Sequence, residues 1–239
     1  MATATHRRQS GGHQVKAVTD EADRRLAALA VALEARRDPD RAVAMVGYMR
    51  DQFAFLGVPA PERRLAQREA LGDWKAPSAD QLAAFARGCW ARDEREYQYA
   101  ACDTLVRQVK RLGPDDLELL EDLITTKSWW DTVDILASRV VGPLADRSTM
   151  ERWLVSGNLW LERAAILHQL GSKERTDPEF VFRACLTHAG SSEFFHRKAI
   201  GWALRQYARV DPAAVSAFVA IHAEELSGLS KREALRRLP

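Results

Sequence analysis

The chain has 239 residues, 46% of them hydrophobic, and a formal net charge of +2, so it is long enough to bury a sizeable core. No apolar run approaches the ~18 residues of a membrane span, and no signal-peptide core follows the first residues, so we expect neither a membrane protein nor a secreted one. Cys89, Cys102 and Cys185 are widely spaced and form no CxxC motif, which indicates a reducing cytoplasm without disulfides.

The small net charge hides an uneven distribution. Residues 1–19 carry +3 from Arg7, Arg8 and Lys16, and residues 230–239 carry another +3, which leaves −4 for the rest of the chain. Any nucleic-acid surface is therefore expected to be a local basic patch on a mildly acidic body.

The chain divides into a short tail and one long helical region. Residues 1–19 are rich in Thr, Ser, Gly and Gln and almost lack large apolar side chains, which predicts a disordered basic tail. Residues 20–239 predict a single domain of consecutive helices. The expected helices cover 20–37, 39–55, 61–71, 78–89, 93–112, 114–125 and 158–170, with others beginning near Trp129, Ser148, Asp177, Glu193, Asp211 and Ser230.

No segment shows the alternation of a strand, so the sequence predicts an all-α protein. Helices of about 10–20 residues, in pairs roughly 35–45 residues apart, are typical of a superhelical solenoid of antiparallel helix pairs. The repeats share little identity, so a helical bundle is the alternative that periodicity leaves open.

The most unusual stretch is KSWWDTVD, residues 127–134. Ser128 followed by an acidic residue at the third position predicts a capping box and a helix from Trp129. Trp129 then falls on an apolar stripe, while Trp130 lies one turn from Asp134 on a neighbouring face. An indole beside a carboxylate suits a flat, cationic target. A core Trp130 and a solvated Asp134 fit the same spacing.

A second group combines cations with an indole. Lys198, Trp202, Arg205 and Arg209 follow at steps of four, three and four, which places them on one helical face. Such a stripe suits a phosphate-tracking surface with a stacking platform, and an ordinary solvated face is its alternative. Gly201 costs a helix about 1 kcal/mol relative to alanine, which suggests a close backbone approach there.

A third group contains Trp160 and Arg163, one turn apart. Arg163 could bind a phosphate or pair with a carboxylate such as Asp134. Tyr48 and Arg64 are weaker candidates for contacts with DNA. The six histidines lack the spacing of a metal site, and no glycine-rich phosphate loop or paired nucleophile is present, so we expect no metal and no cofactor.

Residues 127–134 closely resemble the signature of AlkD-type DNA alkylation repair enzymes, which are alkylpurine DNA glycosylases. The likeness extends, in the family's order, from about Asp20 to the C-terminus. Its other blocks are FLGVP at 55–59, PERR at 61–64, NLWLERAAIL at 158–167, SSEFF at 191–195, KAIGWALR at 198–205 and LSKREA at 229–234.

This resemblance implies HEAT-like repeats with a concave DNA-binding surface, and a monomer that hydrolyses the N-glycosidic bond of cationic N3- and N7-alkylpurines in double-stranded DNA. It implies that Asp134 is the catalytic carboxylate, that Trp130 and Trp202 flank the lesion nucleotide, and that Arg163 assists. Lys198, Arg205, Arg209, Tyr48 and Arg64 would then contact DNA. The alternative is a non-catalytic helical-repeat module that binds DNA or protein.

Overall fold

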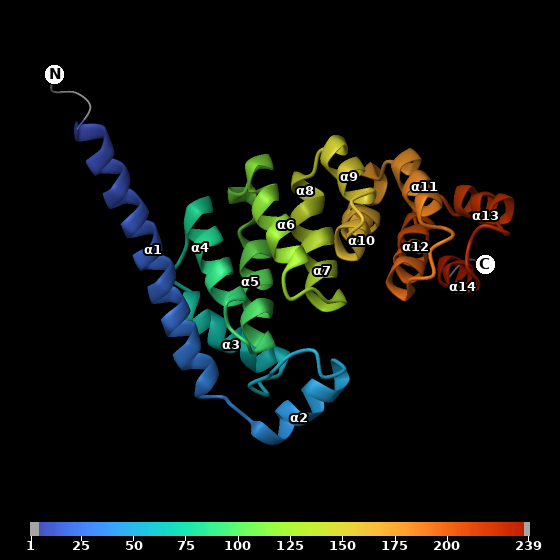
Figure 1. Cartoon of the computed structure of the whole chain (residues 1–239). Coiled ribbons are helices and arrows are strands. Elements are labelled where there is room, and N and C mark those ends of the chain that lie inside the picture. The colour runs from blue at the N-terminus through green and yellow to red at the C-terminus, as the bar shows by residue number, and fades with distance from the viewer. Residues whose placement is uncertain (1–4, 237–239) are drawn as a thin grey trace. The chain divides into compact units, whose positions relative to one another are not determined.

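The computed structural model describes residues 5–236, with side chains from Ala17 onward. Within these residues the protein is all-helical and holds no strand beyond an isolated bridge between Ala54 and Glu94, so the predicted all-α class is confirmed (Figure 1). No helix among them is both long and apolar enough to cross a membrane. The chain forms two compact units that divide between Leu112 and Gly113, within the range predicted as one domain.

The first unit is built around a long N-terminal helix that packs against α3 and α4, while α4 packs against α5. Its helices are α1 (Thr5–Glu34), α2 (Pro39–Tyr48), α3 (Ala60–Leu71), α4 (Ala79–Trp90) and α5 (Arg95–Arg107), followed by a 3-10 turn at Val109–Arg111. Ser78 and Gln81 form the predicted capping box at the start of α4.

Helix α1 begins earlier than the sequence predicts. Its backbone runs as helix through residues 5–19, where a disordered tail is expected, and residues 1–4 of that tail lie outside the described part. No proline interrupts residues 5–34, so the helix has no obligatory break. The first buried side chain among those described is Ala22, close to the predicted start of the domain at Asp20.

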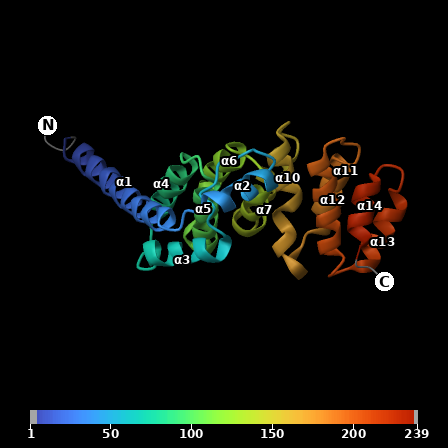
Figure 2. The ribbon, with the colours of Figure 1, turned by 90° about the horizontal axis from the view of Figure 1, so that it is seen from below.

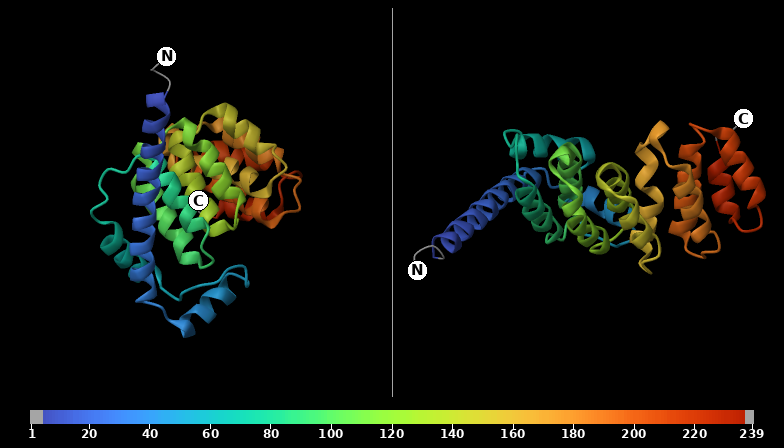
Figure 3. Two further views of the ribbon diagram at one scale, coloured as in Figure 1. Left: turned by 60° about the vertical axis from the view of Figure 1, so that its left-hand side comes forward. Right: turned by 90° about the horizontal axis from the view of Figure 1, so that it is seen from above.

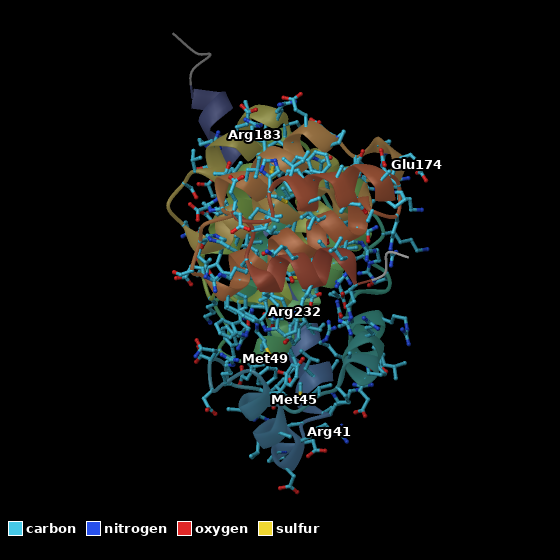
Figure 4. All side chains as sticks on the ribbon, turned by 90° about the vertical axis from the view of Figure 1, so that its right-hand side faces the viewer. Arg41, Met45, Met49, Glu174, Arg183 and Arg232 are labelled. Carbon is cyan, nitrogen blue, oxygen red and sulfur yellow. The ribbon has the colours of Figure 1, made fainter. Side chains whose placement is uncertain are left out.

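Helix α2 is shorter than predicted, since it ends at Tyr48 and not near Phe55. Arg50 and Asp51 have φ angles of +55° and +59°, in the left-handed region, which a right-handed helix cannot continue. None of its residues is buried, and Arg41 and Met45 project from it (Figure 4).

The loop after α2 is held by one buried carboxylate. The backbone N–H groups of Leu56, Gly57 and Val58 donate to Glu96 at 2.9–3.0 Å. Gly57 has φ +88°, and a Cβ there would lie 1.9 Å from the carbonyl oxygen of Asp38, so only glycine fits. Contacts within the first unit therefore explain the glycine of the FLGVP block and the conformation of its backbone.

The second unit stacks helix pairs in chain order (Figures 1, 2 and 3). Helix α9 packs on α10, α11 on α12 and α13 on α14, while α10 also contacts α6, α7 and α12. The helices are α6 (Leu117–Thr125), α7 (Trp130–Leu136), α8 (Gly142–Leu144), α9 (Arg147–Leu154), α10 (Leu159–Leu167), α11 (Pro178–Thr187), α12 (Phe194–Tyr207), α13 (Pro212–Ile221) and α14 (Gly228–Leu235). Short 3-10 segments cover Pro114–Asp116, His168–Gly171 and Lys173–Arg175, and a π-helical turn covers Ala137–Val141.

Three predicted helix starts in this unit are wrong. The Ser128 hydroxyl donates to the carbonyl of Ile124 instead of capping, and α7 begins at Trp130. Asp146 caps α9 in place of Ser148, and Ser227 caps α14 in place of Ser230. In the latter two helices a side-chain acceptor two or three residues before the predicted cap accepts the hydrogen bond from a backbone N–H of the first turn. The predicted caps Asn158, Asp177 and Asp211 are confirmed.

Candidate active site

Asp134 and Arg163 form a two-pronged ion pair between α7 and α10. The Arg163 Nε donates to Asp134 Oδ1 at 2.7 Å, and its Nη2 donates to Oδ2 at 2.8 Å. The Arg163 side chain is 2% exposed and that of Asp134 16% exposed, so solvent reaches the carboxylate and not the guanidinium. Of the two roles left open for Arg163, the structure selects the pair with Asp134, the geometry in which a guanidinium fixes both oxygens of a carboxylate.

Burial raises the pKa of the Asp134 carboxyl above its ordinary value. The two hydrogen bonds and the positive charge of Arg163 oppose that rise, whereas the nearby negative charge of Asp131 adds to it. The carboxylate is thus held rigidly in a poorly solvated position. Water screens the negative charge of such a group poorly, so the charge acts strongly on a ligand bound next to it.

Trp130 is the first residue of α7, one turn before Asp134 on the same helix, and it is half-exposed. A freely solvated Asp134 does not fit its side-chain exposure of 16%, and a fully buried Trp130 does not fit its partly exposed ring. The spacing of four residues places the indole and the carboxylate on adjacent positions of one helical face, as predicted.

Trp129 does not enter the apolar stripe that the sequence predicts for it. It precedes α7 with an extended backbone, and its half-exposed ring packs against Trp160 and Phe195, with ring centroids 5.8 and 5.2 Å away. Trp160 and Phe195 also contact each other at 4.8 Å. The Phe195 carbonyl accepts a hydrogen bond from Arg163, which joins this aromatic cluster to the ion pair. Sequence reasoning missed Phe195 because it comes from the distant α12.

Trp202 is surrounded by three cations. The guanidinium carbon of Arg163 lies 5.5 Å from the ring centroid, the Lys198 ammonium 5.8 Å and the Arg205 guanidinium carbon 5.9 Å. Arg163 therefore touches both the carboxylate of α7 and the indole of α12. The predicted site residues Asp134, Arg163 and Trp202 come together through this one buried side chain.

Glu233 of α14 neutralises part of the basic stripe. Its carboxylate accepts from Lys198 Nζ at 2.8 Å and also pairs with Arg205. These two cations lower the pKa of Glu233 below its ordinary value. A Cβ added to Gly201 would lie 2.4 Å from the Cβ of Glu233, so the close approach predicted at Gly201 is that of α14.

A cavity of about 480 Å³ opens beside this cluster. It is lined by Trp202, Arg205 and Arg209, with Arg236 from the C-terminal end and the side chains of Leu170 and Gln206. Arg209 lies beyond the end of α12 at Tyr207, so the prediction that four residues share one helical face is wrong for it. The turn nevertheless returns Arg209 to the same cavity.

Tyr48 and Arg64 belong to the first unit. Tyr48 ends α2 with 74% of its surface exposed. Arg64 lies on α3 with its side chain 61% exposed, 3.7 Å from the Asp103 carboxylate, which the buried Arg63 also contacts at 2.9 Å. Their contact with DNA stays a prediction.

Glu162, His188 and His196 form the one group of described residues able to hold a metal ion. Each offers a ligand atom, and these atoms lie within 4.8 Å of one another. The three residues lack the close spacing of a sequence motif, since they come from α10, the residue after α11 and the first turn of α12, so the sequence predicts no metal there.

Comparison with known proteins agrees with this architecture. The model of the DNA alkylation repair enzyme family matches residues 29–238. A solved structure described as a "Predicted DNA alkylation repair enzyme from Enterococcus faecalis" is similar to the chain, with a TM-score of 0.77 and 31% identity over 85% of this chain and 97% of the other. None of the curated proteins matches. The chain belongs to the DNA alkylation repair enzyme family.

Proposed function

We propose that the protein is a monofunctional DNA glycosylase that removes cationic N3- and N7-alkylated purines, such as 3-alkyladenine and 7-alkylguanine, from duplex DNA. The observation that carries the proposal is Asp134, a largely buried carboxylate fixed through both oxygens by Arg163, whose guanidinium carbon also lies 5.5 Å from the centroid of the partly exposed Trp202 ring. The partly exposed Trp130 precedes Asp134 by one turn of α7. A module that only binds DNA has no use for a rigid carboxylate, because it repels phosphates.

The chemistry requires little from the protein. A purine alkylated at N3 or N7 carries a positive charge, so the electrons of the glycosidic bond leave with the base and neutralise it. Positive charge then develops on the deoxyribose, as in glycoside hydrolysis. A preorganised carboxylate stabilises this charge, and water adds to the sugar carbon and loses its proton. No acid is needed to protonate the departing base.

Asp134 retains the capacity for both tasks while it is paired. A carboxylate has about four lone-pair positions, and Arg163 uses one on each oxygen. The remaining positions can face the sugar and orient the attacking water. Arg163 acts as a positioning residue, since it is 1% exposed and fixes the carboxylate from behind.

DNA would be held by the aromatic and basic side chains around this point. Trp130 and Trp202 offer indole faces next to the sugar, which add cation–π stabilisation. The cavity lined by Arg205, Arg209 and Arg236 suits a backbone phosphate. Lys198, whose ammonium lies 5.8 Å from the Trp202 ring, adds a further positive charge nearby. We further propose that Tyr48 and Arg64 contact the duplex.

The test is single-turnover release of free base from duplex DNA that has been treated with a methylating agent, with an untreated duplex as control. We expect release of 3-methyladenine and 7-methylguanine, and an abasic site without strand cleavage. Tight binding of the methylated duplex without any base release would contradict the proposal and favour the non-catalytic alternative.

A further inference from the structure

A buried group of two histidines and one glutamate lies behind the candidate active site, and the proposed chemistry does not use it. Glu162 is 9% exposed and His196 4% exposed, while His188 is half-buried. They come from three separate elements: α10, the residue after α11, and the first turn of α12. A ligand bound by all three would join these elements directly.

The hydrogen bonds of each side chain leave one ligand atom for the group. His188 Nε2 lies 2.7 Å from the Leu154 carbonyl, which can only accept, so this nitrogen carries the proton and the lone pair is on Nδ1. His196 Nδ1 lies 3.0 Å from the Ser191 hydroxyl, which can accept its proton. Glu162 Oε1 accepts from the N–H of Gly157 at 2.9 Å, which leaves Oε2.

The remaining atom of His196 has no hydrogen bond of its own. Its Nε2 is buried and makes none, although it lies 3.1 Å from Glu162 Oε2. A neutral imidazole with a buried, unused lone pair is the form that binds a metal.

We propose that Glu162, His188 and His196 bind one divalent transition-metal ion of the zinc class as a structural brace. Two imidazoles and one carboxylate suit Zn²⁺, whereas Mg²⁺ prefers an all-oxygen octahedron. The Leu154 carbonyl, the Ser191 hydroxyl and the Gly157 N–H then orient the three ligands through hydrogen bonds to their other polar atoms.

The consequence of the brace lies in its neighbours along the chain. Glu162 precedes Arg163, and His196 follows Phe195, whose carbonyl accepts from Arg163. A metal that ties α10 to α12 at this point fixes the backbone on both sides of Arg163, and so the position of the Asp134 carboxylate. The proposed role of the metal is structural, because Glu162 and His196 are buried and the proposed reaction does not use them.

The experiment titrates the metal-stripped full-length protein with Zn²⁺, and separately with Mg²⁺, by calorimetry and by thermal melting without DNA. We expect one Zn²⁺ per chain, a melting temperature raised by several degrees and no response to Mg²⁺. Glu162→Gln and His196→Gln should each weaken Zn²⁺ binding by at least the 10–100-fold that loss of a ligand's hydrogen-bond partner costs.

His222→Gln is the matched control. His222 and Glu225 form an exposed histidine–carboxylate pair at 2.7 Å without a third ligand, so its loss should leave Zn²⁺ binding unchanged. His188→Gln provides a second variant at a half-buried position if either buried substitution fails to fold.

Three results would overturn the proposal. Absence of saturable Zn²⁺ binding by the wild type would mean that a proton between His196 and Glu162 completes the group. Binding that survives all three ligand substitutions would place the ion elsewhere, and a thiolate charge-transfer band with Co²⁺ would assign it to cysteine. Both readouts are independent of base release, so they are distinguishable from a failure of the proposed glycosylase activity.

Discussion

Asp134 and Glu233, two carboxylates of the second unit, are each held by hydrogen bonds from cations, and the pKa values of the two shift in opposite directions. Asp134 on α7 is fixed by one buried arginine, and burial raises its pKa. Glu233 on α14 is fixed by Lys198 and Arg205, which lower its pKa. The two side chains are similarly exposed at their surfaces, at 16% and 11%, but the Asp134 carboxyl lies deeper in the protein, so desolvation is the largest contribution to its pKa.

The depth of each carboxyl and the number of its cationic partners decide the direction of its pKa shift. Glu233 has two cationic partners against its own desolvation, so its ionised form is satisfied within the protein. Asp134 has a single cationic partner and the repulsive charge of Asp131 nearby, so the protein stabilises its ionised form less than that of Glu233. A carboxylate of the first kind holds helices together. One of the second kind has negative charge left to act on a ligand.

Asp134→Asn should have the largest effect. We expect base release in a single turnover to fall by roughly 10²–10³-fold, the usual scale for losing one preorganised electrostatic contact. DNA binding should be unchanged or tighter, because a charge that repels phosphate is removed. The buried Arg163 loses its counter-charge, so unfolding should become easier by about 3 kcal/mol, measured by denaturant titration.

Glu233→Gln is the matched comparison, since it also removes a clamped carboxylate beside Trp202. It should reduce stability by about 1–3 kcal/mol through lost hydrogen bonds and change base release by less than about threefold. If the two variants lose base release equally, the catalytic assignment of Asp134 fails. If both retain it, Asp134 is only a structural partner of Arg163.

Gly201→Ala tests how closely α14 packs against α12 next to Glu233. The new Cβ would meet Glu233 Cβ at 2.4 Å and the Ser230 carbonyl oxygen at 3.0 Å, so α14 has to move. We expect a loss of about 1–3 kcal/mol in the free energy of unfolding, the usual range for overpacking. Gly190→Ala is the control in the same unit, because a Cβ there meets nothing within 4 Å. Equal stability of the two variants would contradict the close packing of α14.

The salt dependence of binding distinguishes paired from available cations. Arg209→Ala removes a cation from the cavity beside Trp202, so the slope of log affinity against log salt should become shallower by about 0.9. Lys198→Ala should change the slope less, because Glu233 already offsets that charge. The measurement is DNA binding over a series of salt concentrations. If Lys198→Ala changes the slope more than Arg209→Ala does, Lys198 leaves Glu233 and contacts a phosphate when DNA binds.

The pH dependence of base release should separate the two carboxylates most finely. The proposed reaction uses Asp134 in its ionised form, so the rate should fall as pH drops through the pKa of Asp134, which burial places above the ordinary value of about 3.9. Glu233→Gln should leave this acid limb in place. Its own effect should appear in stability, because the contribution of Glu233 is lost as pH falls through its lowered pKa. If the acid limb shifts in the Glu233→Gln variant, the titration belongs to Glu233 and not to Asp134.

The sequence by itself determined features that depend on near neighbours in the chain. The all-α class, the capping residues Asn158, Asp177 and Asp211, and the one-turn spacing of Trp130 and Asp134 follow from local hydrogen bonding and helical period. The constraint at Gly201 was also visible, because a helix interior tolerates glycine only for a reason.

Only the tertiary structure decided how these elements meet. It paired Arg163 with Asp134, turned Trp129 toward Trp160 and Phe195, and set Glu233 against Lys198 and Arg205. It also gathered Glu162, His188 and His196 from separate elements. Each of these contacts joins residues far apart in sequence, where helical periodicity carries no information about which faces come together. Which carboxylate is satisfied and which keeps its charge for a ligand depends on those long-range contacts, because desolvation and ion pairing are properties of the packed chain.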